Sequence, residues 1–351
     1  MRPSAALVVA LLTLAVCAAV PHPSLEAVLA VADLDAALTR HPGPVTITVG
    51  STSQLCLLDS FLFQWYSAAD GETLPLVVLA LDEASLRMCR KWARGLPVFH
   101  ECLPATHGHD LDEDRRMHHG SLQFQKLVWL KPLLLARALR LGRSAVVTDL
   151  DVVWFKTPST SRHDLRTIAN GGGDDGAGVV LEAACEDKTD PLTPNTGVLA
   201  AKADPALARI VDAWLDPRSD RPGTLSRCAT ALQRTSTTTA RQPTPPLSFR
   251  YGDQAGLHVA LRSLFPNGTS LVRCLSRDQF PLSAQTKSVD RDAAWRGMAI
   301  AAHFNDGAKM NKSQALADHG LFHGKHEDCD YNRARIKAMQ HKRGAPKPPA
   351  G

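Results

Sequence analysis

Two aspartates lie one residue apart, directly after an apolar run, in the stretch SAVVTDLDVVWFKTP (144–158). On an extended backbone, side chains two residues apart point to the same side, so Asp149 and Asp151 would face one direction. Carboxylates placed together repel each other unless a cation or a proton lies between them. Oxygen ligands of this kind suit Mg²⁺ or Mn²⁺, which commonly share their coordination sphere with substrate phosphates. The pair therefore predicts a divalent metal that holds a diphosphate.

The segments before this pair predict how it is positioned. Strand-like and helical segments alternate, beginning with a strand, over 44–50, 55–68, 74–82, 82–95 and 96–102. A βαβαβ order predicts an α/β fold with a mostly parallel sheet flanked by helices on both faces. Such sheets bind ligands beyond the carboxyl ends of their strands. The two aspartates end a further apolar strand, so we expect them at that edge.

Several later segments also have the composition of regular elements. A long helix is expected over 122–142, and Pro132 should kink or divide it. A second helix is expected over 204–215, with Asp204 as its N-cap. Further strands are expected over 179–185 and 298–304, and a further helix over 251–264.

The ends of the chain differ in composition from the single catalytic domain that we predict over 21–330. Residues 1–20 contain an arginine followed by an uncharged run over 5–20, which is typical of a secretory signal. This run is shorter than the ~20 residues that span a bilayer, so a cleaved signal is favoured over a short signal-anchor. Residues 216–248 have the composition of an inserted surface loop, and 331–351 that of a loose basic tail.

Either form of leader would deliver the chain to the secretory pathway. We expect residence in the Golgi lumen, with membrane anchoring through residues 5–20 if the leader is kept and secretion if it is cleaved. Sequons at Asn267 and Asn311 agree with this address. After the leader no cysteine belongs to a Cys-x-x-Cys pair, which in an oxidising compartment predicts disulfides rather than zinc. These seven cysteines are Cys56, Cys89, Cys102, Cys185, Cys228, Cys274 and Cys329, so at least one stays free or pairs with another chain.

The overall composition is that of a globular protein, with 44% hydrophobic and 21% charged residues. The formal net charge of +5 is spread along the chain, apart from a basic run near the C-terminus. No basic patch is interleaved with aromatic residues, so the sequence does not support a nucleic-acid partner.

Four motifs, in order, resemble the nucleotide-diphospho-sugar transferase family, specifically glycosyltransferase family 77 with its GT-A-type fold. The stretch GRSAVVTDLDVVWFKTP (142–158) resembles the family signature, which follows a helix carrying a lysine, here Lys126. The other three are the Asn-x-Gly strand at 195–203, the acidic-Gln helix at 252–261 and the His-Asn-Gly-Lys segment at 301–322. An Asp-x-Asp pair alone is common, whereas four ordered motifs between about residues 45 and 322 are specific.

The resemblance implies a metal-dependent glycosyltransferase with a nucleotide-diphosphosugar donor, expected to be a UDP-sugar, and a glycan or glycoprotein hydroxyl as acceptor. It implies retention of the anomeric configuration. Asp149, Asp151 and His303 would be the ligands of Mn²⁺ or Mg²⁺, with His303 binding through a neutral imidazole. His303 could instead be a histidine that satisfies its hydrogen bonds at a strand end.

The resemblance also implies roles in donor binding and catalysis. The donor-binding residues would be Lys126, Asp149, Asn195, Gly197, Gly307 and Lys312, and the catalytic residues Asp253, Gln254 and Lys309. Lys309 or Lys312 would balance the charge of the departing diphosphate, and Gly307 would let the backbone approach it closely. More ordinary alternatives remain: an exposed helix lysine at 126, a turn asparagine at 195, and helix caps at 253 and 254.

Two other classes of function compete with this one. A silent, secreted glycan-binding protein on the same fold would need no diphosphate site. A metal-dependent phosphohydrolase would need a second cluster of carboxylates and histidines for a two-metal centre, and the sequence offers none. The inserted stretch and His258, where the family pattern leads us to expect asparagine, leave the acceptor undefined.

Overall fold

The computed structural model describes residues 33–40, 43–69, 73–94, 100–105, 122–156, 178–187, 189–215, 252–282, 299, 301–304, 312 and 316, and only the backbone of 122–126. Several predictions concern residues outside this set. They are the leader (1–20), the inserted stretch (216–248), the basic tail (331–351), the sequon at Asn311, Cys228, Cys329, Gly307 and Lys309.

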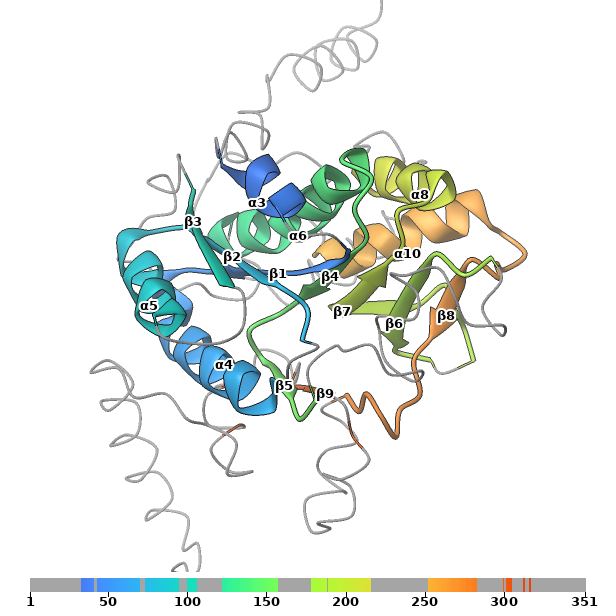
Figure 1. Ribbon diagram of the computed structural model, residues 1–351. Coiled ribbons are helices and arrows are strands. Elements are labelled where there is room, and N and C mark those ends of the chain that lie inside the picture. The colour runs from blue at the N-terminus through green and yellow to red at the C-terminus, as the bar shows by residue number, and fades with distance from the viewer. Residues whose placement is uncertain are drawn as a thin grey trace, which may run out of the picture.

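The core of the fold is a seven-stranded sheet with the strand order β3-β2-β1-β4-β7-β6-β8 (Figure 1). Its strands are β1 (Val45–Gly50), β2 (Leu76–Ala80), β3 (His100–Pro104), β4 (Ala145–Thr148), β6 (Leu181–Cys185), β7 (Pro194–Ala201) and β8 (Val272–Cys274). Strands β3, β2, β1 and β4 are parallel, as are β6 and β8, and β7 runs antiparallel to both β4 and β6. The sheet confirms the predicted α/β fold with mostly parallel strands.

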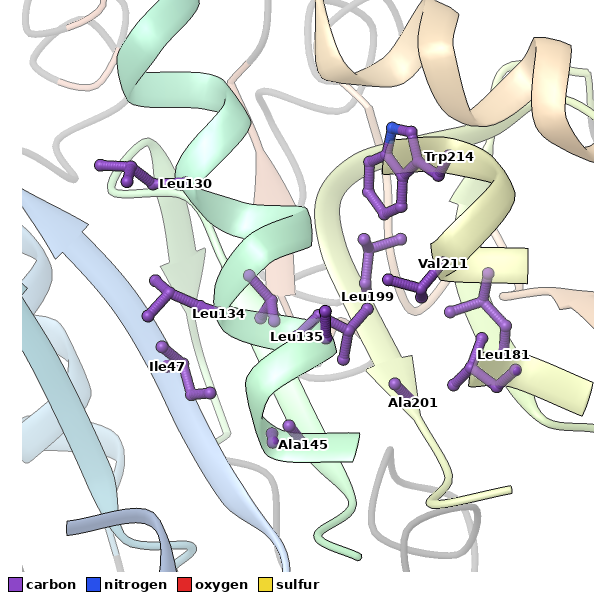
Figure 2. Close-up of a cluster of buried hydrophobic side chains, with 14 of the residues drawn as sticks. Ile47, Leu130, Leu134, Leu135, Ala145, Leu181, Leu199, Ala201, Val211 and Trp214 are labelled. Atoms are coloured by element: carbon purple, nitrogen blue, oxygen red, sulfur yellow. The ribbon is translucent and has the colours of Figure 1, made fainter. Parts of the chain in front are cut away.

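Helices cover both faces of this sheet, and strands β1, β2, β4, β6 and β7 are accordingly buried along their whole length. They are α3 (Leu34–Arg40), α4 (Leu55–Ala68), α5 (Glu83–Ala93), α6 (Leu122–Arg140), α8 (Pro205–Leu215) and α10 (Asp253–Leu264). Along β4, Ala145 and Val147 join the core beneath α6 and α8, and Val146 joins the core beneath α4. Figure 2 shows α6 and α8 packed on the first of these cores.

Two helices begin at an aspartate cap, and the predicted cap at Asp204 is confirmed. The Asp82 carboxylate accepts from the Ser85 backbone N–H at 2.8 Å and starts α5, and the Asp204 carboxylate accepts from the Ala206 N–H at 2.7 Å and starts α8. Pro132 does not divide α6, which runs through it as one element. Leu130 and Leu134 on either side of the proline are both fully buried, so tertiary packing holds both halves of the helix in place.

A second, two-stranded sheet lies beyond the end of β4. It pairs β5 (Val152–Trp154) with β9 (Ala301–His303) in antiparallel register, with Val152 opposite His303. Trp154 is 2% exposed and packs edge-on against Trp65 of α4 at 5.6 Å between ring centroids, so it is a core residue. This small sheet brings the C-terminal segment beside the two aspartates.

Disulfides form as predicted from the cysteine spacing. Cys89 pairs with Cys102, Cys185 pairs with Cys274, and Cys56 is disulfide-bonded as well. Among the described helices, none has the length and apolar composition required to cross a membrane.

Candidate active site

The two aspartates lie in a turn rather than in a strand. Strand β4 ends at Thr148, and the chain turns through Leu150 before β5 begins at Val152. The turn is held by the Asp149 N–H, which donates to the Gly197 carbonyl at 2.9 Å, and by the Phe304 N–H, which donates to the Asp151 carbonyl at 3.0 Å. The two carboxylates therefore converge because of this turn. The sequence pattern predicted that they share one side of an extended strand, and that explanation is wrong.

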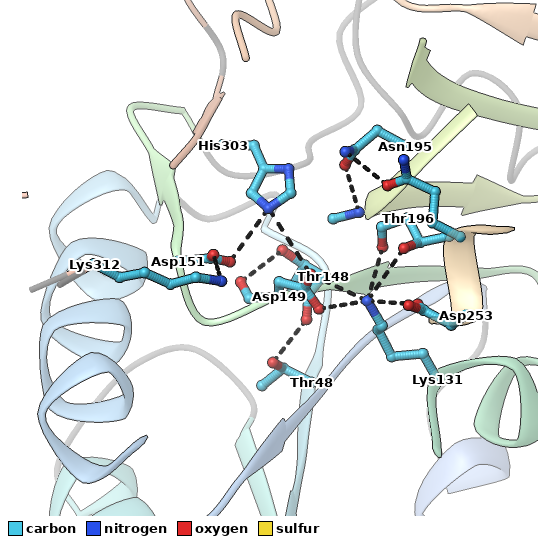
Figure 3. Close-up of polar contacts among 12 residues, drawn as sticks. Thr48, Lys131, Thr148, Asp149, Asp151, Asn195, Thr196, Asp253, His303 and Lys312 are labelled. Atoms are coloured by element: carbon cyan, nitrogen blue, oxygen red, sulfur yellow. Dashed lines mark hydrogen bonds and ion pairs between the residues drawn. The ribbon is translucent and has the colours of Figure 1, made fainter. Parts of the chain in front are cut away.

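His303 completes the group from the other strand of the small sheet (Figure 3). Its Nε2 atom lies 3.3 Å from an Asp151 carboxylate oxygen and 3.9 Å from an Asp149 oxygen. One ligand atom from each of the three residues lies within 4.8 Å of the other two. Two carboxylates and one imidazole are a donor set that suits a Mn²⁺-like ion, so the residues present fit the predicted metal.

Gly197 of β7 makes room for this histidine. A Cβ atom at position 197 would lie 2.2 Å from the His303 ring carbon Cε1 and 2.3 Å from Nδ1. No real side chain tolerates such distances, so the ring can occupy its place only over a glycine. The requirement for glycine in the Asn-x-Gly motif thus has a packing explanation here.

Lys131 of α6 is a site residue that sequence reasoning missed. Its ammonium lies 2.8 Å from an Asp149 carboxylate oxygen, 2.8 Å from an Asp253 oxygen and 3.4 Å from the Thr196 carbonyl (Figure 3). The side chain is buried, at 5% exposure. The signal for it was a lysine inside the apolar run VWLKPLLL, where an unpaired charge would be costly.

Electrostatic pairing keeps Asp151 and Lys131 charged. Burial would raise the pKa of Asp151, but the Lys312 ammonium and His303 outweigh burial and hold that pKa well below its usual range. Burial would lower the pKa of Lys131, but Asp149 and Asp253 outweigh it and raise that pKa. For Asp149, burial is the largest effect and raises the pKa despite the neighbouring Lys131. Each buried charge therefore depends on its partner.

A second polar group extends from the aspartates toward α10. The Asn195 amide donates to the Gln254 side-chain oxygen at 2.9 Å, and its own oxygen accepts from the Gly197 N–H at 2.8 Å. The N-cap of α10 is Gly252, with no side-chain cap. Asp253 and Gln254 therefore face Lys131 and Asn195 and are not simple caps. His258 follows one turn later, with Nε2 2.8 Å from the Pro194 carbonyl.

The two aspartates line a pocket at the carboxyl edge of the parallel strands, where such sheets bind ligands. Its charged lining is Lys131, Asp149, Asp151 and Lys312, and its apolar lining includes Val49, Leu57 and Leu127. Lys312 pairs with the Asp151 carboxylate. The backbone of Lys126 lies in α6 five residues before Lys131, but its side chain is outside the described set, as are Gly307 and Lys309.

Comparison with known proteins gives the family to which this α/β fold and its charged pocket belong. The model of the nucleotide-diphospho-sugar transferase family matches residues 74–316, and the chain belongs to that family. The prediction of a glycosyltransferase is thereby confirmed. A search of curated proteins found no match.

Solved structures of glycosyltransferases resemble the chain at low sequence identity. Mouse xyloside xylosyltransferase 1, in its apo form, is 12% identical, with 77% of this chain and 100% of that chain covered and a TM-score of 0.44. The galactosyltransferase LgtC, solved with donor and acceptor sugar analogues, is 12% identical, with 82% and 99% covered and a TM-score of 0.42. The bifunctional glycosyltransferase WbbM is 11% identical, with 84% and 52% covered and a TM-score of 0.46.

Proposed function

We propose that this enzyme transfers a sugar from a nucleotide-diphosphosugar, with a UDP-sugar as the expected donor, to a hydroxyl of a glycan or glycoprotein. The observation that carries the proposal is the convergence of Asp149, Asp151 and His303 at the carboxyl edge of the sheet, beside buried Lys131. A pocket that concentrates carboxylates and an imidazole, and that also presents ammonium groups, is suited to a diphosphate bound with a divalent cation.

Asp149, Asp151 and His303 would hold the cation, which we propose to be Mn²⁺ or Mg²⁺. When bound, it would supply positive charge to a diphosphate leaving group. Lys131 fixes the Asp149 carboxylate through a 2.8 Å contact, and Gly197 leaves space for the imidazole of His303. The protein thus orients Asp149 and His303 through neighbouring groups that themselves need not touch the cation.

The transfer itself is proposed to proceed on one face of the sugar, with retention of configuration. The acceptor oxygen attacks the anomeric carbon on the side from which the diphosphate departs. The bond between that carbon and the diphosphate oxygen breaks, its electron pair stays on the diphosphate, and the hydroxyl proton passes to that oxygen. Asp149 and Asp253 both pair with Lys131, so we assign neither as a covalent nucleophile.

The remaining predicted residues receive proposed roles around this reaction. Lys312, and Lys309 with Gly307 from the same segment, would neutralise and approach the departing diphosphate, and Lys126 would reach the nucleotide. Asn195 and Gln254, joined at 2.9 Å, would offer donors and acceptors to sugar hydroxyls, with Asp253 beside them.

We also propose where the enzyme works. The leader at residues 1–20 and the sequons support residence in the Golgi lumen or secretion, with residues 5–20 as the membrane anchor if they are retained. The disulfides are consistent with an oxidising compartment.

A donor screen tests the proposal. Residues 21–351, produced in a eukaryotic host, would be incubated with Mn²⁺ and a panel of UDP-sugars, and donor hydrolysis or transfer would be measured by release of UDP. We expect turnover with one donor, loss of turnover in excess chelator, and loss in Asp151→Asn. The matched control is Asp278→Asn, an exposed aspartate outside the pocket, which should retain full activity.

Calorimetric titration with UDP separates the proposal from its rival. Binding of UDP that requires Mn²⁺ supports the transferase. A correctly folded protein that binds no UDP in the presence of Mn²⁺ would contradict it and favour a silent glycan-binding protein.

A further inference from the structure

A second cluster of reactive side chains lies at the β3 edge of the sheet, away from the pocket. The Cys89–Cys102 disulfide joins α5 to β3 there (Figure 1). The ring of His100 lies against this disulfide, with Nε2 2.8 Å from Cys89 Sγ and 3.4 Å from Cys102 Sγ. On the opposite side of the ring, Nδ1 is hydrogen-bonded to the Tyr66 hydroxyl. None of these groups takes part in the proposed transfer reaction.

The protonation of this cluster follows from its burial. Burial lowers the pKa of His100 to about 4 and raises the pKa of Tyr66, so both groups are neutral at pH 7. A phenol is a stronger hydrogen-bond donor than a neutral imidazole N–H, so the Tyr66 hydroxyl donates to Nδ1 of His100. The ring proton then resides on Nε2, and the Nε2–H group points at the sulfur atoms. An N–H donor aimed at sulfur stabilises a thiolate that forms there.

The two sulfur atoms differ in their access to solvent. Cys89 is 0% exposed, whereas Cys102 is partly exposed on an edge strand. Of the two residues, Cys102 is therefore the one that is accessible to an incoming thiolate. The imidazole lies closer to Cys89 Sγ, the sulfur that would leave. Access and stabilisation thus favour the same direction of bond cleavage.

We propose that the Cys89–Cys102 disulfide is a site of thiol–disulfide exchange, with Cys102 as the sulfur that is attacked and Cys89 as the leaving thiolate. A small thiol such as glutathione, deprotonated by solvent, forms a new S–S bond to Cys102. The Cys89–Cys102 bond breaks, and its electron pair stays on Cys89 Sγ, which accepts a hydrogen bond from His100 Nε2 and then takes a proton from solvent. The product is a mixed disulfide on Cys102 and a free thiol at Cys89.

The same molecule contains a reference disulfide for this comparison. Cys185 pairs with Cys274 between β6 and β8, and Cys185 is 1% exposed. In the part of the chain that the structure describes, no imidazole contacts either of these sulfurs. Cys274 is partly exposed, as Cys102 is, so each disulfide joins one buried and one partly exposed cysteine. The two disulfides therefore meet the same thiol under the same conditions and differ in the neighbouring histidine.

The test uses the full, unreduced protein and reduced glutathione. After timed exposure, free thiols are alkylated and each cysteine is assigned by peptide mass mapping. Because a hydrogen bond to a charged group corresponds to about a tenfold change in rate or more, we expect Cys89–Cys102 to open at least ~10 times faster than Cys185–Cys274. We expect glutathione on Cys102 and an alkyl group on Cys89. Equal opening rates, or glutathione on Cys89, would overturn the proposal.

Two variants isolate the histidine. His100→Phe keeps a ring but removes the N–H donor, so opening of Cys89–Cys102 should slow by roughly tenfold, and Cys185–Cys274 should react at an unchanged rate. Tyr66→Phe removes the hydroxyl that fixes the His100 tautomer and should slow opening by a smaller factor. If folded His100→Phe opens Cys89–Cys102 as fast, relative to Cys185–Cys274, as the wild type does, the proposal is also overturned. If His100→Phe does not fold, the proposal is still tested by two measurements on the wild type. They are the ratio of the opening rates of the two disulfides and the identity of the cysteine that carries glutathione.

Discussion

Lys131 is the residue on which the charge balance of the active site depends. One buried ammonium lies 2.8 Å from each of two carboxylates, those of Asp149 and Asp253. These carboxylates come from parts of the chain more than 100 residues apart. Lys131 therefore connects the end of β4 to the start of α10, and its contribution is both structural and electrostatic.

Replacing this lysine should destabilise the protein strongly. In Lys131→Met both carboxylates lose their buried partner, which should lower the free energy of unfolding by about 3–5 kcal/mol. The double variant Lys131→Met/Asp253→Asn should lose less than the sum of the two single changes, because the groups interact directly. Urea unfolding measures the free energy of unfolding of the two single variants and of the double variant. Exposed Lys91→Met is the control and should change stability by less than about 0.5 kcal/mol. Wild-type stability in Lys131→Met would refute this account.

Gly197 offers a sharper test of how His303 is positioned. In Gly197→Ala the new methyl group would lie about 2.2 Å from the His303 ring, so the ring must move away from the two aspartates. Loss of a well-oriented ligand should weaken Mn²⁺-dependent UDP binding by about 10–100-fold. Calorimetry would measure the effect. Gly252→Ala is the matched control, because a Cβ there meets nothing within 4 Å. Equal metal affinity in the two variants would show that His303 is not a ligand.

Among the elements, the packing of β3 against α4 and α5 should make stability depend on pH. Burial holds the pKa of His100 near 4, below the ordinary value of 6.5. Between these values the unfolded chain binds more protons than the native protein, so stability should fall as the pH decreases from about 6.5 toward 4. We expect His100 to account for about 2–3 kcal/mol of this loss.

Urea unfolding at pH 7 and pH 4.5 measures the loss. Carboxylates also titrate in this range, so the informative quantity is the difference between wild type and His100→Gln. The variant should lose less stability on acidification than the wild type. Parallel losses in the two proteins would mean that the imidazole is already solvated in the native state.

The helices and strands show which features of the fold could be predicted from the sequence and which could not. Helix α4 was predicted to the residue, because an apolar run of 14 residues is too long for an ordinary strand and indicates a buried helix. The direction of β7 was not predicted, since an apolar strand has the same pattern in either direction. A strand was expected over 298–304, and β9 lies within it, but its pairing with β5 was not predicted, because strands of three residues carry no signal for their partner. Their pairing nevertheless places His303 at the aspartates.

Most residues of the candidate site were predicted from the sequence, but one was not. Asp149, Asp151, Asn195, Asp253, Gln254, His303 and Lys312 do gather around one pocket or its rim. Lys131 was missed, because helix position alone does not say which lysine of a helix faces a carboxylate. That distinction depends on α10 packing beside α6, a contact between residues distant in sequence.

For the whole molecule, the proposed location in the secretory pathway can be tested at the sequon of Asn267. This asparagine is exposed in the turn between α10 and β8, so a glycan would meet no obstacle in the described part of the fold. Protein made in a eukaryotic host should lose mass on treatment with an N-glycosidase. Asn267→Gln should remove one glycan, and Asn267→Gln/Asn311→Gln should abolish the shift. If Asn267 and Asn311 are unmodified and the cysteines are reduced, the proposed location in the secretory pathway is contradicted.

The Cys185–Cys274 disulfide has a consequence for a chain that has been cut. The covalent link encloses residues 216–250, so cleavage of any one peptide bond there leaves the N-terminal and C-terminal pieces joined as a single molecule. Each piece carries part of the pocket, with Lys131 and Asp149 on one and Asp253 and His303 on the other. A nicked enzyme should therefore migrate as one species on a denaturing gel without reductant and as two with it. Before denaturation, it should keep its active site assembled.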